Sequence, residues 1–297
     1  MKNIEAPSRV NVRSVLFLTD FSPSSAAAIP YAAEITKHFG SKLYALHMRP
    51  PIINPMTRPA GWAALEHAAQ AEANAETDEL MASFAGLRPE VSIKEGNFWE
   101  VLRSTIEEHK IDLIVMGTRG RSGIRKLLLG SKAEEVFRQA PCAVLTVGPS
   151  ASALPAHAGE FTEIVYATDF TPESTAAAAH AISLAQEFQS HLTMLHVIAE
   201  DKPGDLVRAE EVRAASEHRL RKLVPAEAET WCVPRFEVEH GPVAETILEA
   251  AKRRKADLIV LGIRKPTGLP GAATHLPIAT AHRVVSEAEC PVLSVRG

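Results

Sequence analysis

Three glycines and a serine are spaced so that they could hold a phosphate group. In the segment GTRGRSGIRKLLLGSK, which starts at Gly117, they form the pattern G-x2-G-x9-G-S with Gly120, Gly130 and Ser131. Glycine accepts positive φ angles and has no side chain, so backbone N–H groups can come close to an anion. Ser131 would begin a helix, whose free N–H groups and dipole favour negative charge, and Arg119 adds positive charge nearby. The spacing therefore predicts a phosphate-binding loop.

Two better-known phosphate loops do not match this segment. A Walker A loop would end in GK[ST], and the dinucleotide fingerprint GxGxxG would follow a first strand, where this chain has TDFSPSS from Thr19. The remaining alternative is an exposed loop in which the glycines form turns and the arginines face solvent.

Short apolar, β-rich runs alternate with longer helical patterns along the first half of the chain. The expected strands are Val15–Thr19, Leu43–His47, Val91–Lys94, Leu113–Met116 and Ala143–Val147. Strands that alternate with helices pair in parallel, and helices cover both faces of the sheet. Ligands of such sheets bind beyond the carboxyl ends of strands where the winding direction reverses, which points to the residues after strands one and four.

A helix is expected to begin immediately after the first strand. Ser22 followed by Pro23 is typical of an N-cap with proline in the first helical position, which places the helix start beside Asp20. Thr171 and Pro172 repeat this arrangement in the second half.

The chain is an internal repeat. VLFLTDFSPSS matches IVYATDFTPES with Asp20 and Asp169 149 positions apart, and PCAVLTV matches ECPVLSV with Cys142 and Cys290 148 positions apart. Ordered matches over both halves indicate a duplicated domain. We expect domains at 1–149 and 161–297, joined by a linker at 150–160 that is rich in Pro, Ala and Ser.

Both halves resemble universal stress protein domains, and the first resembles their ATP-binding subclass. The resemblance rests on VLFLTDFS, YALHM, DLIVMGTRGRSG, LLGS and PCAVLTV and on their counterparts in the second half. It implies two tandem, open, parallel five-stranded sheets ordered 3-2-1-4-5, flanked by helices in a Rossmann-like α/β fold. It also implies that the halves pair through their final strands, Ala143–Val147 and Pro291–Val295, and that chains can pair again as homodimers.

The same resemblance implies an ATP site in the first half. Slow hydrolysis of ATP at this site would have Mg²⁺ as its companion ion. The adenine and ribose would lie by the end of strand one and just past strand two, and the ribose and phosphates over the loop after strand four. The implied nucleotide-binding residues are Leu18, Thr19, Asp20, Met48, Met116, Gly117, Arg119, Gly120, Gly130 and Ser131. Alternatively, Asp20 only supports the helix start. His47 and His196 end apolar strands and are interpreted as core residues rather than ligands.

The second half departs from the loop pattern. Lys265 replaces the second glycine, and Ile278 and Ala279 take the places of Gly130 and Ser131, so we expect weak or no ATP binding there. Gly268 and Gly271 could form another anion-binding turn, or the half is retained for pairing with the first.

The charge, the cysteines and the apolar runs of the chain argue against several classes of protein. The 297 residues carry a formal net charge of -4, which offers no overall positive field for nucleic acid. The three cysteines form no CxxC pair, and no apolar run approaches the ~20 residues of a membrane span. We expect a cytoplasmic protein that binds neither membranes nor nucleic acids.

The leading functional hypothesis is a regulatory module in which ATP changes conformation or association and a protein partner reads the change in a stress response. A slow ATPase or nucleotidyl-transfer enzyme of the same fold is the rival, although no residue is assigned a catalytic or metal-binding role. A nucleotide-free interaction scaffold is the third interpretation.

Overall fold

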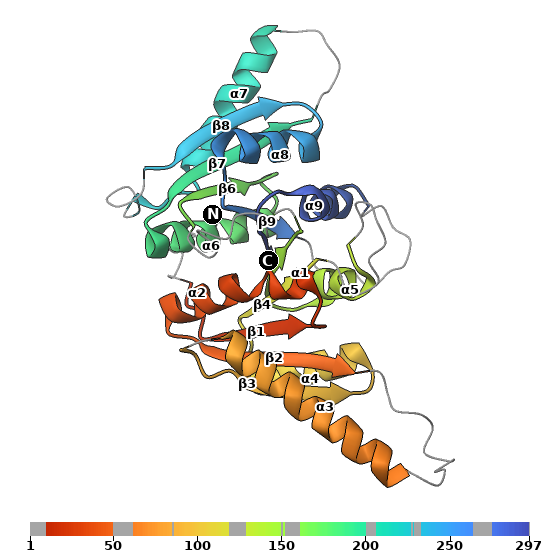
Figure 1. The fold of residues 1–297 in the computed structure, drawn as a ribbon. Helices are drawn as coiled ribbons and strands as arrows, with labels where there is room; N and C mark the ends of the chain where they lie inside the picture. Colours follow the sequence, from red (N-terminus) through yellow and green to blue (C-terminus); the bar gives the residue numbers. More distant parts are fainter. Residues whose placement is uncertain are drawn as a thin grey trace.

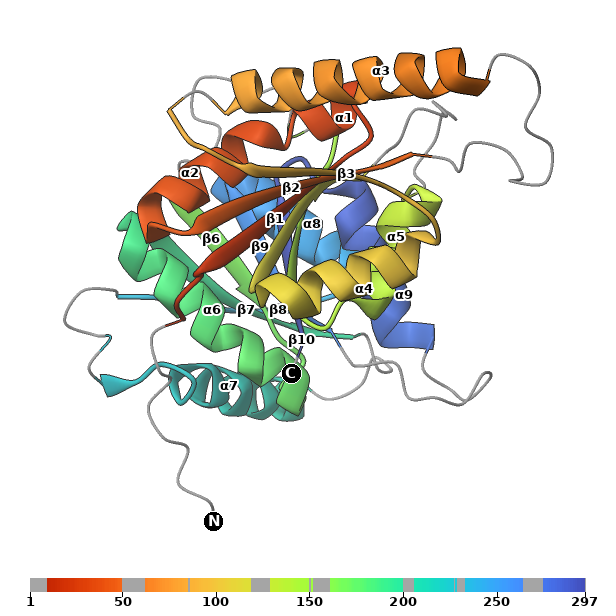
Figure 2. The same cartoon turned by 90° about the horizontal axis from the view of Figure 1, so that it is seen from below.

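The computed structural model describes residues 10–49, 62–84, 86–118, 129–149, 151, 161–199, 206–226, 228, 233–263 and 275–296. In these residues ten strands form one sheet in the order β3-β2-β1-β4-β5-β10-β9-β6-β7-β8 (Figures 1 and 2). The strands are β1 (Ser14–Thr19), β2 (Lys42–Arg49), β3 (Glu90–Glu95), β4 (Leu113–Gly117), β5 (Ala143–Val147), β6 (Glu163–Ala167), β7 (His191–Ile198), β8 (Arg235–His240), β9 (Leu258–Ile263) and β10 (Val292–Arg296).

Helices cover both faces of this sheet (Figure 2). Buried side chains from α2, α3, α6 and α7 belong to one apolar core, and those from α4, α5, α8 and α9 to the other. The helices are α1 (Pro23–Ala26), α2 (Ile29–Phe39), α3 (Trp62–Ser83), α4 (Phe98–His109), α5 (Ser131–Gln139), α6 (Pro172–Phe188), α7 (Leu206–Arg221), α8 (Val243–Arg254) and α9 (His275–Glu287).

The strand pattern explains why there are two cores. In β1, Val15 and Phe17 belong to the first core, and Leu16 and Leu18 to the second. Successive side chains on a strand point to opposite faces, so an uninterrupted apolar run supplies both faces of a covered sheet. The sequence expectation of an α/β fold with parallel strands ordered 3-2-1-4-5 in each half is confirmed.

The two sheets are not separate, however, because their last strands pair. β5 and β10 are antiparallel, with Leu145 opposite Leu293, and Thr146 Oγ1 donates a hydrogen bond to the backbone oxygen of Val292 at 3.1 Å. An edge strand presents unpaired N–H and C=O groups, and this pairing satisfies them in both halves. Leu145 and Leu293 hold equivalent positions, 148 residues apart, so a pseudo-twofold axis relates the halves.

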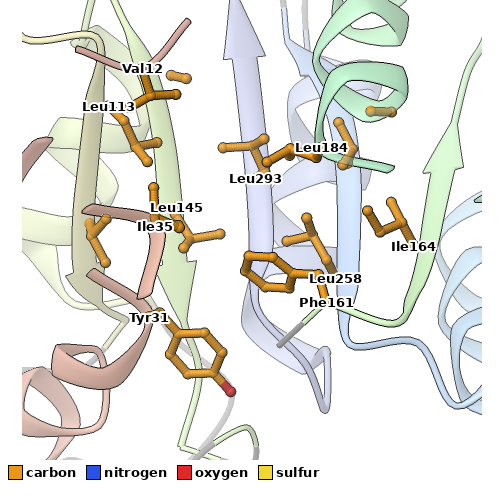
Figure 3. Close-up of a cluster of buried hydrophobic side chains, with 14 of the residues drawn as sticks. Val12, Tyr31, Ile35, Leu113, Leu145, Phe161, Ile164, Leu184, Leu258 and Leu293 are labelled. Atoms are coloured by element: carbon orange, nitrogen blue, oxygen red, sulfur yellow. The ribbon is translucent and has the colours of Figure 1, made fainter. Parts of the chain in front are cut away.

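Helix packing adds to this junction on one face of the sheet. His38 of α2 donates from Nε2 to the backbone oxygen of Glu187 at 2.6 Å, and its ring stacks on Phe188 with centroids 4.2 Å apart. Tyr31 stacks on Phe161 with centroids 6.2 Å apart. Figure 3 shows side chains of α2 and β5 facing those of the second half across this contact.

The expected helix starts are present, with one difference between the halves. Ser22 and Thr171 are N-caps whose side chains accept hydrogen bonds from Ser25 N and Ser174 N. The second-half helix then runs unbroken to Phe188, whereas the first stops at Ala26 and resumes at Ile29. Pro30 accounts for the break, because proline cannot donate the helical hydrogen bond to the residue four positions earlier.

Candidate functional site

A cleft of about 290 Å³ lies at the carboxyl ends of β1, β2 and β4. Eight of the sequence-predicted site residues line it together: Leu18, Thr19, Asp20, Met48, Met116, Gly117, Gly130 and Ser131. The other two, Arg119 and Gly120, lie outside the described residues. The cleft therefore sits where the winding direction of a parallel sheet reverses, between β1 and β4.

A tight turn after β1 forms one wall. Asp20 Oδ1 accepts a hydrogen bond from Ser22 N at 3.0 Å, and Thr19 Oγ1 accepts one from Phe21 N at 3.0 Å. Phe21 adopts a left-handed conformation with a φ of 56°, which is uncommon for a residue with a large side chain. The aspartate thus supports the turn and helix start and also presents its carboxylate to the cleft.

Gly117 has a packing role that the glycine pattern did not predict. A Cβ at this position would lie 2.4 Å from the backbone oxygen of Ser24, at the start of α1. Gly262, its counterpart, would bring a Cβ within 2.2 Å of Ser174 Cα. In both halves this position near the end of β4 or β9 therefore has to be glycine, because the start of the helix that follows β1 or β6 approaches it closely, whatever the loop binds.

The start of α5 forms the opposite wall. Gly130 is its N-cap and makes no side-chain capping bond, and the exposed Ser131 is the first residue of this nine-residue helix, as expected. The first N–H groups of a helix lack partners within the helix and attract anions. Gly130 N donates to Thr118 O at 2.8 Å, which ties this helix start to the end of β4.

Sequence reasoning missed several residues of the cleft. Phe98 is the first residue of α4, just after β3, and is half-buried. Lys132 Nζ lies 4.3 Å from the centre of its ring. Lys132 also lies 3.8 Å from Glu135. The buried hydroxyl of Ser25 contacts Thr19 Oγ1 at 3.1 Å. Lys132 could have been predicted as a site residue from the sequence, because it follows Ser131 directly and a cation at a helix start lies near any anion bound there.

The histidines near the carboxyl ends of β2 and β7 make structural contacts. His47 Nδ1 donates to the backbone oxygen of Thr19 at 2.8 Å, and His196 Nδ1 donates to that of Thr168 at the same distance. Each ring packs on the phenylalanine of the adjacent turn, Phe21 or Phe170. Burial lowers the pKa of His196, the bond to Thr168 opposes this, and nearby Arg219 lowers the pKa further.

The second half keeps the turn but not the helix start. Asp169 Oδ1 accepts hydrogen bonds from Thr171 N at 3.0 Å, Thr171 Oγ1 at 2.6 Å and Ser174 Oγ at 2.7 Å, so the carboxylate is engaged within its own turn. α9 begins at His275, which places Ala279 beyond the first turn, where its N–H lies within the helical bonding pattern. Lys265, Gly268, Gly271 and the side chain of Ile278 lie outside the described residues.

The described residues contain no cluster of three or more His, Cys, Asp or Glu side chains that could hold a metal ion. Within the same ranges, no helix is both long and apolar enough to cross a membrane.

Comparison with known proteins identifies relatives of both halves. The model of the universal stress protein family matches residues 11–148 and 160–296. A universal stress protein of Methanocaldococcus jannaschii is 30% identical over 139 residues, which are 46% of this chain and 81% of that protein. One from Mycolicibacterium smegmatis is 26% identical over 300 residues, covering 95% of this chain and 96% of its own.

Solved structures show the same fold over the whole chain. The crystal structure of a universal stress protein from Archaeoglobus fulgidus superposes with a TM-score of 0.71 at 20% identity and covers 97% of this chain and 99% of that one. A putative universal stress protein from Pseudomonas aeruginosa gives a TM-score of 0.64 at 21% identity, with coverages of 96% and 93%.

Proposed function

Because the chain belongs to the universal stress protein family, with one domain in each half, we propose that its first domain binds ATP in the cleft between β1, β4 and α5. The observation that carries this proposal is the joint placement of eight predicted residues around one cleft at the reversal point of the sheet. Apolar side chains and a helix start meet there, as the base and phosphates of a nucleotide require.

The cleft has separate regions for the parts of the ligand. Leu18, Leu46, Met48, Met116 and Phe98 offer an apolar lining for adenine. Gly130, Ser131 and Lys132 surround the start of α5 and would take the phosphates. Asp20 can accept hydrogen bonds from ribose hydroxyl groups.

The residues that line the cleft could hold Mg²⁺ only together with the phosphates of a bound nucleotide. Among the described residues that line the cleft, Asp20 alone carries a carboxylate, and Mg²⁺ bound with nucleotides uses phosphate oxygens, water and one or two carboxylates. Asp20 and Ser131 would be the protein groups nearest such an ion. When bound, it would neutralise phosphate charge.

We propose that the biological output is regulatory. Nucleotide occupancy would change the conformation or association of this cytoplasmic protein, and a protein partner would read the change. The second domain would contribute docking rather than a second ATP site, because Ala279 lies within α9 instead of at its start.

A thermal melt with and without ATP tests the proposal. Binding to the folded state alone adds about 2.7 kcal/mol of stability when ATP is present at a hundredfold excess over Kd. Gly130→Val, which places a side chain at the helix start, should abolish the shift. Ala279→Val, an exposed site in the second domain, should preserve it. The proposal fails if the wild-type protein shows no shift with either ATP or AMP.

A further inference from the structure

A second cavity, of about 140 Å³, lies between the two domains at the opposite ends of the strands from the nucleotide cleft. Its lining comes from both domains and is mostly apolar, and it includes Ile35, Leu145, Leu184, Leu258 and Leu293 (Figure 3). Two further lining residues, Val12 and His180, set its shape. We call this space the dyad cavity.

The repeat shows that the two sides of the pseudo-twofold axis differ in the residues that meet beside this cavity. Tyr31 and Phe161 form a ring stack across the junction, with centroids 6.2 Å apart. At the same offset of 149 positions, Tyr31 corresponds to His180, and Phe161 corresponds to Val12. The pair equivalent to Tyr31 and Phe161 is therefore an imidazole and an isopropyl group. Both groups of this smaller pair line the cavity, and Phe161 lines it as well.

One polar group that lines this cavity could select a ligand by forming a hydrogen bond with it. Nδ1 of His180 is buried and has no hydrogen-bond partner of good geometry among the described residues. Burial lowers the pKa of His180, although the backbone of Ala176 opposes this, and a lowered pKa favours the neutral ring. A neutral imidazole has one nitrogen that donates and one that accepts. Two other polar side chains of the lining have structural partners: Ser183 Oγ accepts from Val10 N, and Asp112 Oδ2 accepts from Arg13 N and Ser14 N. Asn11, a third, is exposed.

We propose that the dyad cavity binds a small single-ring aromatic molecule that carries one hydroxyl group, with the ring in the place of the missing aromatic pair and the hydroxyl on His180. The size agrees, because an engineered apolar cavity of about 150 Å³ in another protein takes up benzene. Such a ligand would contact both domains at once. Its binding would therefore stabilise their docked arrangement.

Calorimetric titration of the full chain with phenol is the first test. Wild-type protein should bind phenol saturably with one site per chain. Val12→Phe, which installs the residue found at the equivalent position, should fill the cavity and weaken binding at least tenfold. Val233→Phe makes the same exchange at a position that is 87% exposed and should leave the affinity unchanged. Absence of saturable binding to the wild type, or equal binding by Val12→Phe, overturns the proposal.

A second measurement uses the wild type alone, so it does not depend on whether a variant folds. Crystals grown with 4-bromophenol should give an anomalous bromine peak between Val12 and His180, and a peak elsewhere or none would overturn the assignment. His180→Leu should reduce the preference for phenol over benzene. Gly130→Val should not alter phenol binding, so failure here is distinguishable from failure of the ATP proposal.

Discussion

Leu145 of β5 and Leu293 of β10 lie opposite each other at the junction of the two domains, and each holds the same position in its own repeat. Both are buried within a core that continues from one domain into the other. The junction is therefore part of the folded core rather than a surface contact between finished domains.

We predict that Leu293→Ala lowers the free energy of unfolding by about 2–5 kcal/mol, the usual cost of removing a leucine side chain from a packed core. Urea denaturation followed by circular dichroism measures this change. Val233→Ala, at an exposed position, should stay within about 0.5 kcal/mol of the wild type. An equally small effect for Leu293→Ala would mean that the junction contributes little to stability.

Gly117→Ala and Gly262→Ala should each destabilise the chain by about 1–3 kcal/mol, since the new methyl group would overlap the backbone at Ser24 or at Ser174. Thermal unfolding without nucleotide measures both. Gly148→Ala is the matched control, because its Cβ would meet no atom closer than 3.4 Å. If Gly262→Ala were neutral, the close helix approach would not explain why this glycine occurs in both domains.

Lys132→Gln should weaken ATP binding about fivefold, a loss near 1 kcal/mol, because an exposed charge beside the phosphates contributes modestly. Adenosine affinity should not change, since adenosine has no phosphate for Lys132 to contact. Paired titrations with the two ligands separate these effects. An equal loss for both ligands would instead place Lys132 at the base, through its contact with Phe98.

The free energy of unfolding should decrease as pH falls from about 7 to 5, partly through His180 and His196. Burial lowers both pKa values below the ordinary 6.5, so the unfolded chain takes up protons first as pH falls. Their contribution is fully present above the unfolded pKa and declines below it. A double variant with His180→Gln and His196→Gln should show a flatter dependence in urea titrations, and an unchanged slope would contradict this origin.

The sequence was sufficient to predict the fold because local signals agreed with one another. β5 has the predicted bounds, and β1, β3 and β4 extend the predicted runs by one residue at an end or at both ends. Pairing of the final strands was expected only from the family resemblance, because hydrophobic patterns describe each strand but do not show that two edges share hydrogen bonds in one ten-stranded sheet. The break between α1 and α2 could have been predicted from Pro30, because proline lacks the N–H that a continuous helix needs there.

The candidate site was predictable where it follows strand ends, and less so where it depends on contacts across the fold. Gly130 and Ser131 were predicted from their spacing, and Leu18 to Asp20 from the family resemblance. Phe98 was missed because the segment between β3 and α4 carries no phosphate-binding pattern. The packing role of Gly117 was missed because it depends on Ser24, which is distant in the chain.

Joining the two domains in one polypeptide makes their association independent of protein concentration, because the linker keeps each partner at a high effective concentration near the other. It also removes the constraint that acts on a homodimer, where every substitution appears twice. One domain can then lose a ligand while its twin keeps it, and equivalent positions at the junction can carry different residues, as Tyr31 and His180 do. The duplicated chain is thus free to specialise its halves separately.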